Sequence, residues 1–269
     1  MSAVPLSPSA TPEEIYLSRL MAARLLLPTS VPGIYGRGAR FVEVLEGLAR
    51  SITQLGRTES THVWECPPIL PHTAVEKYSS SLAFPHPRTT PGANLGDLTL
   101  APSACCYVYP TLTGTLATAG CTIDIESWCY RSAASLNPMQ MRAFRMREFV
   151  YAGTEAQAQG FRESWIVQAQ AFLSALGLES EQQTQDETLD IVVPMLSGAC
   201  PTALLSVNHH QDHFGKLFDI RTPDGASAHT SCVAFGMERI ALALLAQHGL
   251  QPSKWPQELR TRLHLDSLN

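Results

Sequence analysis

Two segments joined by a short loop dominate the middle of the chain. Residues 121–131 read CTIDIESWCYR, in which the side chains alternate between two sides, and residues 144–153 read FRMREFVYAG. Such alternation is typical of a β-strand, in which successive side chains point to opposite faces. The intervening SAASLNPMQMRA contains Pro138, which indicates a loop. We therefore predict a long β-hairpin at this place.

Glu148 is unexpected within the second of these strands. Period-two alternation places its carboxylate on the same face as Phe144 and Met146. A buried carboxylate is costly unless it is paired or bound to a cation. Glu148 is therefore either a surface carboxylate, or paired with Arg145 or Arg147, or bound to another cation.

The other segments predict helices and short strands. Thr11 and Pro12 indicate one helix start and Thr154 another, whose helix we expect to end at Gly177. Two further helices are expected at residues 41–56 and 237–249. Strands are expected at residues 61–66, 105–112, 189–196, 201–214, 216–222 and 227–236. Adjacent strands with helices outside them indicate an α+β fold with an antiparallel sheet.

Three polar stretches are expected to lie outside this core. Residues 1–12 indicate a disordered leader, residues 179–187 a polar connection and residues 251–269 a polar tail. The chain of 269 residues is long enough for one large domain, which we place at residues 13–269.

Composition argues against several classes of protein. The net charge is −5 and the isoelectric point about 6.0, whereas a nucleic-acid partner usually needs a basic face. The sequence has no apolar run of membrane-spanning length and no secretory signal. Its seven cysteines are odd in number and have no disulfide-framework spacing, which favours a reducing, cytoplasmic setting.

Five blocks of sequence in this order resemble a known family. They are similar to the catalytic domain of class II aminoacyl-tRNA synthetases, and most of all to the amino acid:[carrier protein] ligases. That branch is similar to seryl-tRNA synthetases but lacks the tRNA-binding domain. The blocks are GIYGRGARF, CCYVYP, CYRSAASLNPMQMRAFRMREFVYAGT, NHHQDHFG and AHTSCVAFGMERIALAL, and they extend over most of the chain from Gly33 to Gly249.

The resemblance implies that Glu148 binds a zinc ion. It assigns the metal ligands to Cys106, Glu148 and Cys232, with Cys105 as the alternative first ligand. Three protein ligands leave a fourth zinc position open, which the resemblance assigns to the α-amino group of the substrate.

The same family resemblance implies a nucleotide-binding site. Arg131 matches the arginine that grips the ATP α-phosphate and the substrate carboxylate, for which a planar guanidinium is suited. Arg239 matches the arginine near the γ-phosphate, at the start of a helix, where anions are favoured. Asp190 stands where the family usually has a glutamate, and Ala133 replaces the glutamate of the family's Arg-x-Glu pattern. The alanine puts ATP handling in question.

The activity implied is ATP-driven ligation. A small amino acid would react with Mg-ATP to give aminoacyl-adenylate and pyrophosphate, and would then pass to the phosphopantetheine thiol of a carrier protein. Two alternatives stay open: a degenerate paralogue that only binds a carrier or small molecule, and a transferase that moves an already activated aminoacyl group without ATP. A tRNA synthetase is the least favoured alternative, because the isoelectric point argues against tRNA as a partner.

Two interaction surfaces are expected as well. The resemblance implies a homodimer formed through residues 41–55 and 61–66. It also implies carrier docking on the helix at residues 154–177, which carries Arg162, Glu163 and Trp165, unless this is an ordinary surface helix.

Two further groups of residues are expected to be structural. In NHHQDHF we expect hydrogen-bonded strand residues near the pocket rather than a metal site. Four more cysteines are expected to be small buried hydrophobes: Cys66, Cys121, Cys129 and Cys200.

Overall fold

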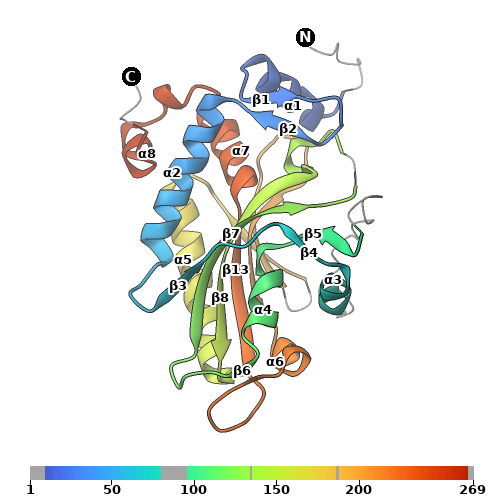
Figure 1. Ribbon diagram of the computed structural model, residues 1–269. Coiled ribbons are helices and arrows are strands. Elements are labelled where there is room, and N and C mark those ends of the chain that lie inside the picture. Colours follow the sequence, from blue (N-terminus) through green and yellow to red (C-terminus); the bar gives the residue numbers. More distant parts are fainter. Residues whose placement is uncertain (1–9, 80–95, 134, 186–187, 266–269) are drawn as a thin grey trace.

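A seven-stranded sheet forms the centre of the molecule in the computed structural model, which describes residues 10–79, 96–133, 135–185 and 188–265 (Figure 1). All neighbouring strands are antiparallel except the parallel pair of β3 and β7. In spatial order the strands are β3 (Thr61–Trp64), β7 (Cys121–Tyr130), β8 (Ala143–Gly153), β13 (His229–Gly236), β11 (Thr202–His209), β10 (Thr188–Val193) and β9 (Glu181–Gln185). The predicted α+β fold with an antiparallel sheet is confirmed.

The predicted hairpin is confirmed as β7 and β8. Their register runs from Cys121 opposite Ala152 to Tyr130 opposite Ala143, and it places Ile125 opposite Glu148. Because side chains alternate, one face of the hairpin carries Asp124 with the even-numbered β7 residues, and the other carries Glu148.

Three long helices cover the first of these faces: α2 (Ala39–Gly56), α5 (Glu155–Ala175) and α7 (Met237–His248). Thr154 caps α5 as predicted, because its side chain accepts from the Gln157 N–H in a capping box. Trp165 of α5 is buried and stacks on Phe149 of the sheet with ring centroids 4.9 Å apart. This face holds the larger hydrophobic core of the molecule.

Short elements cover the other face. They are the 3₁₀ helix η1 (Ala104–Tyr107), α4 (Val108–Thr111), β6 (Gly114–Thr115), α6 (His213–Phe218) and β12 (Ile220–Arg221). Tyr109 stacks on Phe214 with centroids 3.9 Å apart and joins η1–α4 to α6. The smaller core on this face includes four buried cysteines: Cys105, Cys106, Cys129 and Cys232.

The N-terminal part lies at one end of the sheet, above α2 and α7 (Figure 1). It consists of α1 (Pro12–Ala22) and a hairpin of β1 (Leu26–Pro28) and β2 (Tyr35–Arg37). Further along the chain, β4 (Ile69–Pro71) pairs with β5 (Leu98–Leu100) beside α3 (His72–Ser79).

Several predicted boundaries are wrong. Thr11 caps α1 and Pro12 begins it, so the predicted leader is too long by these residues; most of it, residues 1–9, lies outside the described residues. Residues 105–112 are helical rather than a strand. The expected connection at 179–187 contains strand β9, its last two residues lying outside the described residues. The expected strand at 216–222 begins with the end of α6, and only β12 is extended.

The expected polar tail is also wrong over its described part. It forms η3 (Pro252–Lys254) and α8 (Gln257–Arg262), and Trp255, Leu259 and Leu263 are buried in the larger core. Three apolar side chains spaced four residues apart are enough to anchor such a short helix, because packing rather than propensity stabilises it.

The remaining cysteines differ from each other. Cys129 is buried as predicted, Cys66 and Cys121 are half-buried, and Cys200 is exposed, so the prediction is wrong for Cys200. Within the described residues, none of the helices has the length and apolarity needed to cross a bilayer.

Candidate functional site

A cavity of about 260 Å³ opens where the β7–β8 hairpin meets the start of α7. Arg131 and Arg239, the two predicted phosphate-binding residues, both line it, together with Phe144 and Ser206. The loop between β7 and β8 contributes Pro138 and Met139. The structure therefore brings together two residues that lie far apart in the sequence.

Arg239 is rigidly held. Its Nε donates to the Met139 carbonyl and its Nη1 to the Ala203 carbonyl, both at 2.9 Å. Burial, reinforced by the nearby charge of Arg131, lowers the pKa of Arg239 to about 10. Both guanidiniums stay protonated at neutral pH, and their mutual repulsion favours a polyanion between them.

Arg131 and Asp190 complete this charged region. The Arg131 guanidinium stacks over the Phe144 ring with 4.6 Å from Cζ to the centroid, and burial lowers its pKa. Asp190 accepts a hydrogen bond from Ser206 and is near enough to Arg239 to raise the pKa of that guanidinium. Asp190 does not itself line the cavity, so its contact with a ligand stays a prediction.

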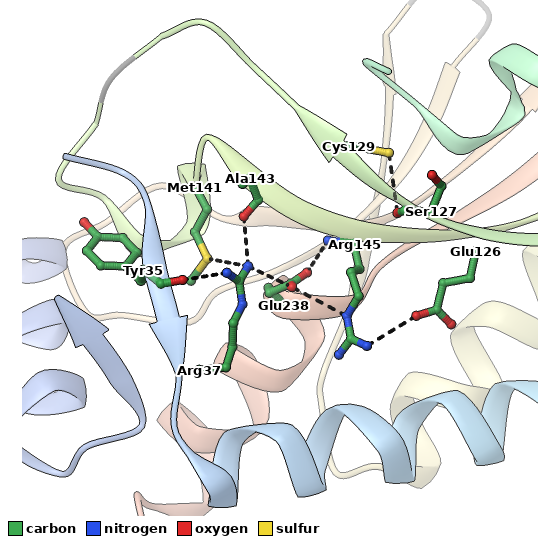
Figure 2. Close-up of polar contacts among 9 residues, drawn as sticks. All are labelled: Tyr35, Arg37, Glu126, Ser127, Cys129, Met141, Ala143, Arg145 and Glu238. Carbon is green, nitrogen blue, oxygen red and sulfur yellow. Dashed lines mark hydrogen bonds and ion pairs between the residues drawn. The ribbon is translucent and has the colours of Figure 1, made fainter. Parts of the chain in front are cut away.

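A second network, centred on Glu238 at the wall of the cavity, was not predicted (Figure 2). The buried Glu238 carboxylate accepts from Arg37 Nη2 at 3.0 Å and from the Arg145 backbone N–H at 2.7 Å. Arg37 also donates to the Ala143 carbonyl at 2.8 Å, and Arg145 forms a longer ion pair with Glu126 at 3.6 Å. The network joins β2, β8 and α7 and so fixes the helix start that presents Arg239. Its only sequence signal is the position of Glu238 next to Arg239.

Ala133 lies exposed in the loop after β7. No carboxylate is available at this position, so whatever role the usual glutamate has cannot be filled by residue 133.

Glu148 lies on the other side of the hairpin from that network and is 1% exposed. Its Oε1 accepts the backbone N–H of Ala104 at 2.9 Å and that of Cys105 at 3.4 Å. None of the ion pairs among the described residues includes Glu148. Burial raises the pKa of this carboxyl, although these hydrogen bonds partly offset the effect.

The two arginines that could have paired with Glu148 point elsewhere. Arg147 binds Asp124 on the opposite face through Nε at 2.9 Å and Nη2 at 2.6 Å. Arg145 pairs with Glu126 and Glu238. A surface role and a pairing with either arginine are thus both excluded for Glu148, whose partners in the structure are backbone N–H groups and a thiol.

Cysteines surround the Glu148 carboxylate. The Cys105 thiol hydrogen-bonds to Glu148, and Cys232 is close enough for their charges to interact. The Cys106 sulfur contacts Ser103 Oγ at 3.1 Å and also interacts electrostatically with Glu148. Burial raises the pKa of all these thiols, to about 12 for Cys106.

The donor chemistry of this cluster fits zinc, because thiols and a carboxylate are ordinary zinc ligands and they lie buried without a cationic side chain. In the part of the chain that the structure describes, however, no three His, Cys, Asp or Glu side chains form a group that could hold a metal ion. Of the two neighbouring cysteines, Cys105 is the one whose thiol hydrogen-bonds to Glu148.

The NHHQDHF segment is only partly as predicted. Strand β11 ends at His209, Gln211 has a positive φ of 50°, and α6 begins at His213. His210 is buried and hydrogen-bonds to Thr230 and Tyr109, as expected for a structural residue near the site. Burial lowers the pKa of His210 to about 3.

On α5, Trp165 is buried and thus unable to meet a partner, while Glu163 is exposed and Arg162 half-buried. On the predicted dimer surface, β3 is an edge strand of the sheet and Val63 is 54% exposed.

Comparisons with known proteins come from sequence first. No protein-family model matches the chain. It is 30% identical to amino acid–[acyl-carrier-protein] ligase 1 of Bradyrhizobium diazoefficiens, over 98% of this chain and 95% of that protein. It is 31% identical to ligase 2 of the same organism, over 87% of this chain and 84% of that protein. The type-2 serine–tRNA ligase of Methanopyrus kandleri is 25% identical over 52% of this chain and 32% of its own length.

Solved structures agree on the fold. The M. kandleri seryl-tRNA synthetase in complex with A. aeolicus tRNASec superposes with a TM-score of 0.75 at 18% identity, covering 93% of this chain and 60% of that one. The prolyl-tRNA synthetase of Giardia lamblia in complex with prolyl-adenylate gives 0.74 at 13% identity, covering 87% and 53%. The fold is therefore that of the class II aminoacyl-tRNA synthetases, and this chain spans little more than half the length of either synthetase.

Proposed function

This chain belongs to the amino acid–[acyl-carrier-protein] ligases, and we propose that it uses ATP to activate a small amino acid and then loads that amino acid onto the phosphopantetheine thiol of a carrier protein. The chain is a ligase of the class II synthetase-like type. The single observation that supports the proposed chemistry most is the cavity lined by Arg131 and Arg239 on the same hairpin as the buried cluster around Glu148.

In the activation step, a carboxylate oxygen of the amino acid attacks the α-phosphorus of Mg-ATP. The bond from that phosphorus to the bridging oxygen of the β-phosphate breaks, and pyrophosphate leaves. Arg131 would hold the α-phosphate and the carboxylate, while Arg239, fixed by two carbonyls, would hold the terminal phosphate. Positioning and cationic stabilisation are the main requirements of such a step.

In the transfer step, the carrier thiol attacks the carbonyl carbon of the aminoacyl-adenylate. The carbon–oxygen bond to AMP breaks, AMP leaves, the thiol proton passes to solvent or phosphate, and a thioester forms. The thioester places the amino acid on the carrier.

The cluster around Glu148 would hold zinc through one cysteine of the Cys105–Cys106 pair, Glu148 and Cys232. When bound, zinc would offer its open coordination position to the α-amino group of the substrate. Cys106 is the expected first ligand, whereas the hydrogen bond between Cys105 and Glu148 supports Cys105. Metal analysis of Cys105→Ser and Cys106→Ser separates the two, because only the ligand variant should lose the expected single zinc.

Pyrophosphate exchange tests the activation step. With a panel of amino acids, we expect exchange of labelled pyrophosphate into ATP that depends on glycine, alanine or another small amino acid. Arg239→Gln should reduce it by two orders of magnitude or more, while the exposed Arg19→Gln on α1 serves as the matched control. Exchange with none of the amino acids would contradict the proposal.

Ala133 favours one competing function, a paralogue that binds a carrier or transfers a preformed aminoacyl group without adenylating. Carrier loading from an aminoacyl thioester donor in the absence of ATP would support that alternative. Charging of tRNA by the purified protein would instead support a synthetase. The seven free cysteines suit a reducing compartment, and we place the enzyme in the cytoplasm.

The proposal includes a homodimer formed through α2 and β3. An edge strand with an exposed apolar residue, Val63, is a ready surface for a partner. Light scattering at micromolar concentration should give twice the chain mass, and Val63→Lys should shift the mass towards the monomer. A wild-type mass equal to one chain would contradict the dimer.

Carrier docking on α5 is the remaining part of the proposal. Since Trp165 is buried, the contact would involve the outer face that carries Glu163 and the half-buried Arg162. Arg162→Glu should slow carrier loading at low salt and leave zinc content unchanged, because carriers are acidic. The control is Arg19→Glu, the same reversal on α1. Equal rates of carrier loading by both variants would contradict docking on α5.

A further inference from the structure

Three polar side chains converge on the sulfur of Cys232. Asn208 lies opposite Cys232 across the β11–β13 pair, and its Nδ2 is 3.6 Å from the sulfur. His210 Nε2 is 3.7 Å from the same sulfur. The Tyr109 hydroxyl also hydrogen-bonds to it. All of these groups are buried, so the sulfur exchanges hydrogen bonds with protein rather than with water.

The orientation of the His210 ring is fixed from several sides. Its backbone N–H donates to the Thr230 carbonyl at 2.8 Å, and Thr230 N–H donates to the Gln211 carbonyl at 3.0 Å. The ring packs edge-on against Tyr109 and Phe214, with centroid distances of 5.8 and 5.0 Å. Rotation of this ring away from Cys232 would therefore break contacts with three elements.

The second ring nitrogen of His210 has two hydroxyl neighbours. His210 Nδ1 is 3.1 Å from Thr230 Oγ1 and 3.3 Å from the Tyr109 hydroxyl. The Thr230 hydroxyl can donate to Nδ1, and the proton of a neutral imidazole then lies on Nε2, where it faces sulfur. In this arrangement the Nε2–H is a donor aimed at the sulfur, which accepts it.

We propose that His210 is a positioning residue that donates its Nε2–H to the Cys232 sulfur and so holds that sulfur in the orientation of a metal ligand. The proposal rests on the zinc site of the proposed function. Partners of this kind commonly set the orientation and basicity of metal ligands, and their loss typically weakens metal binding about 10- to 100-fold. Asn208 supplies a second N–H to the same sulfur.

The test measures the rate of metal release from the intact chain, which is loaded with zinc or with cobalt. His210→Leu removes the donor at similar volume and should release zinc to a chromogenic chelator about 10- to 100-fold faster than wild type. His210→Gln keeps an N–H near the place of Nε2 and should restore most of the difference. In the cobalt-loaded protein, the sulfur-to-cobalt charge-transfer band should shift in His210→Leu and return in His210→Gln.

A matched pair of hydroxyl deletions controls for general destabilisation. Thr230→Val removes the hydroxyl beside Nδ1 and should speed release by a smaller factor. Ser231→Ala removes the next hydroxyl along the strand, which is buried and donates to the Ala158 carbonyl at 2.7 Å on the opposite face, and should not change release.

The outcomes separate the two proposals. Wild-type protein that binds neither zinc nor cobalt overturns the zinc site and this role together. Wild-type binding with release from His210→Leu within about twofold of wild type overturns the role of His210 alone. If His210→Leu does not fold, ¹⁵N NMR of wild type decides instead, because a proton on Nδ1 in place of Nε2 also overturns the role.

Discussion

Arg147 and Glu148 are neighbours on β8 and point to opposite faces of the hairpin. Among the described residues, Arg147 has an ion-pair partner and Glu148 has none. On the helix-covered face, Arg147 and Asp124 form a buried pair through two hydrogen bonds, and Arg57 Nε adds a third to Asp124 at 2.6 Å. On the other face, Glu148 is as buried as Asp124 and has backbone N–H groups and a thiol as its neighbours.

The two buried carboxylates differ in how their charge is compensated. The Asp124 carboxylate is neutralised by the protein and fastens α2 to the sheet, since Arg147 also donates to the Ala49 carbonyl of that helix. The Glu148 carboxylate has no cationic side chain beside it, and its burial is offset only in part by hydrogen bonds from backbone N–H groups and a thiol. A buried charge is therefore informative mainly through the partner it lacks.

Breaking the completed pair should have the largest effect. Asp124→Ala leaves Arg147 buried without a counter-ion, and we expect a loss of about 3–5 kcal/mol in the free energy of unfolding. Urea denaturation of the zinc-loaded protein measures it. A loss below 1 kcal/mol would show that the pair does not hold this face together.

Metal removal should have the next largest effect, and it acts on the other face. With free zinc about 100-fold above its dissociation constant, binding stabilises the folded state by about 2.7 kcal/mol. Chelation should lower the melting temperature of wild type and leave that of Cys232→Ser unchanged. Equal shifts in both proteins would mean that the chelator acts elsewhere.

Glu148→Gln tests whether the Glu148 charge, unlike that of Asp124, destabilises the zinc-free protein. In zinc-free protein the substitution removes an uncompensated buried charge while its amide oxygen still accepts from the Ala104 N–H, so we expect a gain of about 1 kcal/mol. The half-exposed Glu126, paired with Arg145 on the opposite face, gives the control Glu126→Gln, which should bring no gain. Destabilisation of the zinc-free Glu148→Gln protein would contradict this view of the site.

Arg57→Ala should have the smallest effect. Its side chain is 39% exposed, and Asp124 keeps both hydrogen bonds from Arg147, so we expect a loss of about 0.5–1 kcal/mol. A denaturation midpoint as low as that of Asp124→Ala would show that Arg57, and not Arg147, is the main partner.

Much of the fold follows from local patterns in the sequence. The alternation of residues 121–131 and 144–153 predicts the β7–β8 hairpin, and Thr11 and Thr154 predict two helix starts whose capping boxes the structure contains. These features are local, because strand periodicity and helix capping involve residues a few positions apart. The two arginines of the cavity could be named only through the family resemblance.

Only the tertiary structure decided which partner each buried group has. The Cys105–Glu148 hydrogen bond, the Arg37–Glu238 pair and the His210–Cys232 contact each join residues that are more than 20 positions apart in the chain. Short elements also escaped local patterns: η1–α4 and α8 are helical because burial of Tyr109 and Leu259 stabilises turns too short to form alone. Period and capping are properties of neighbouring residues, whereas the burial of a charge and its compensation depend on which distant elements pack together.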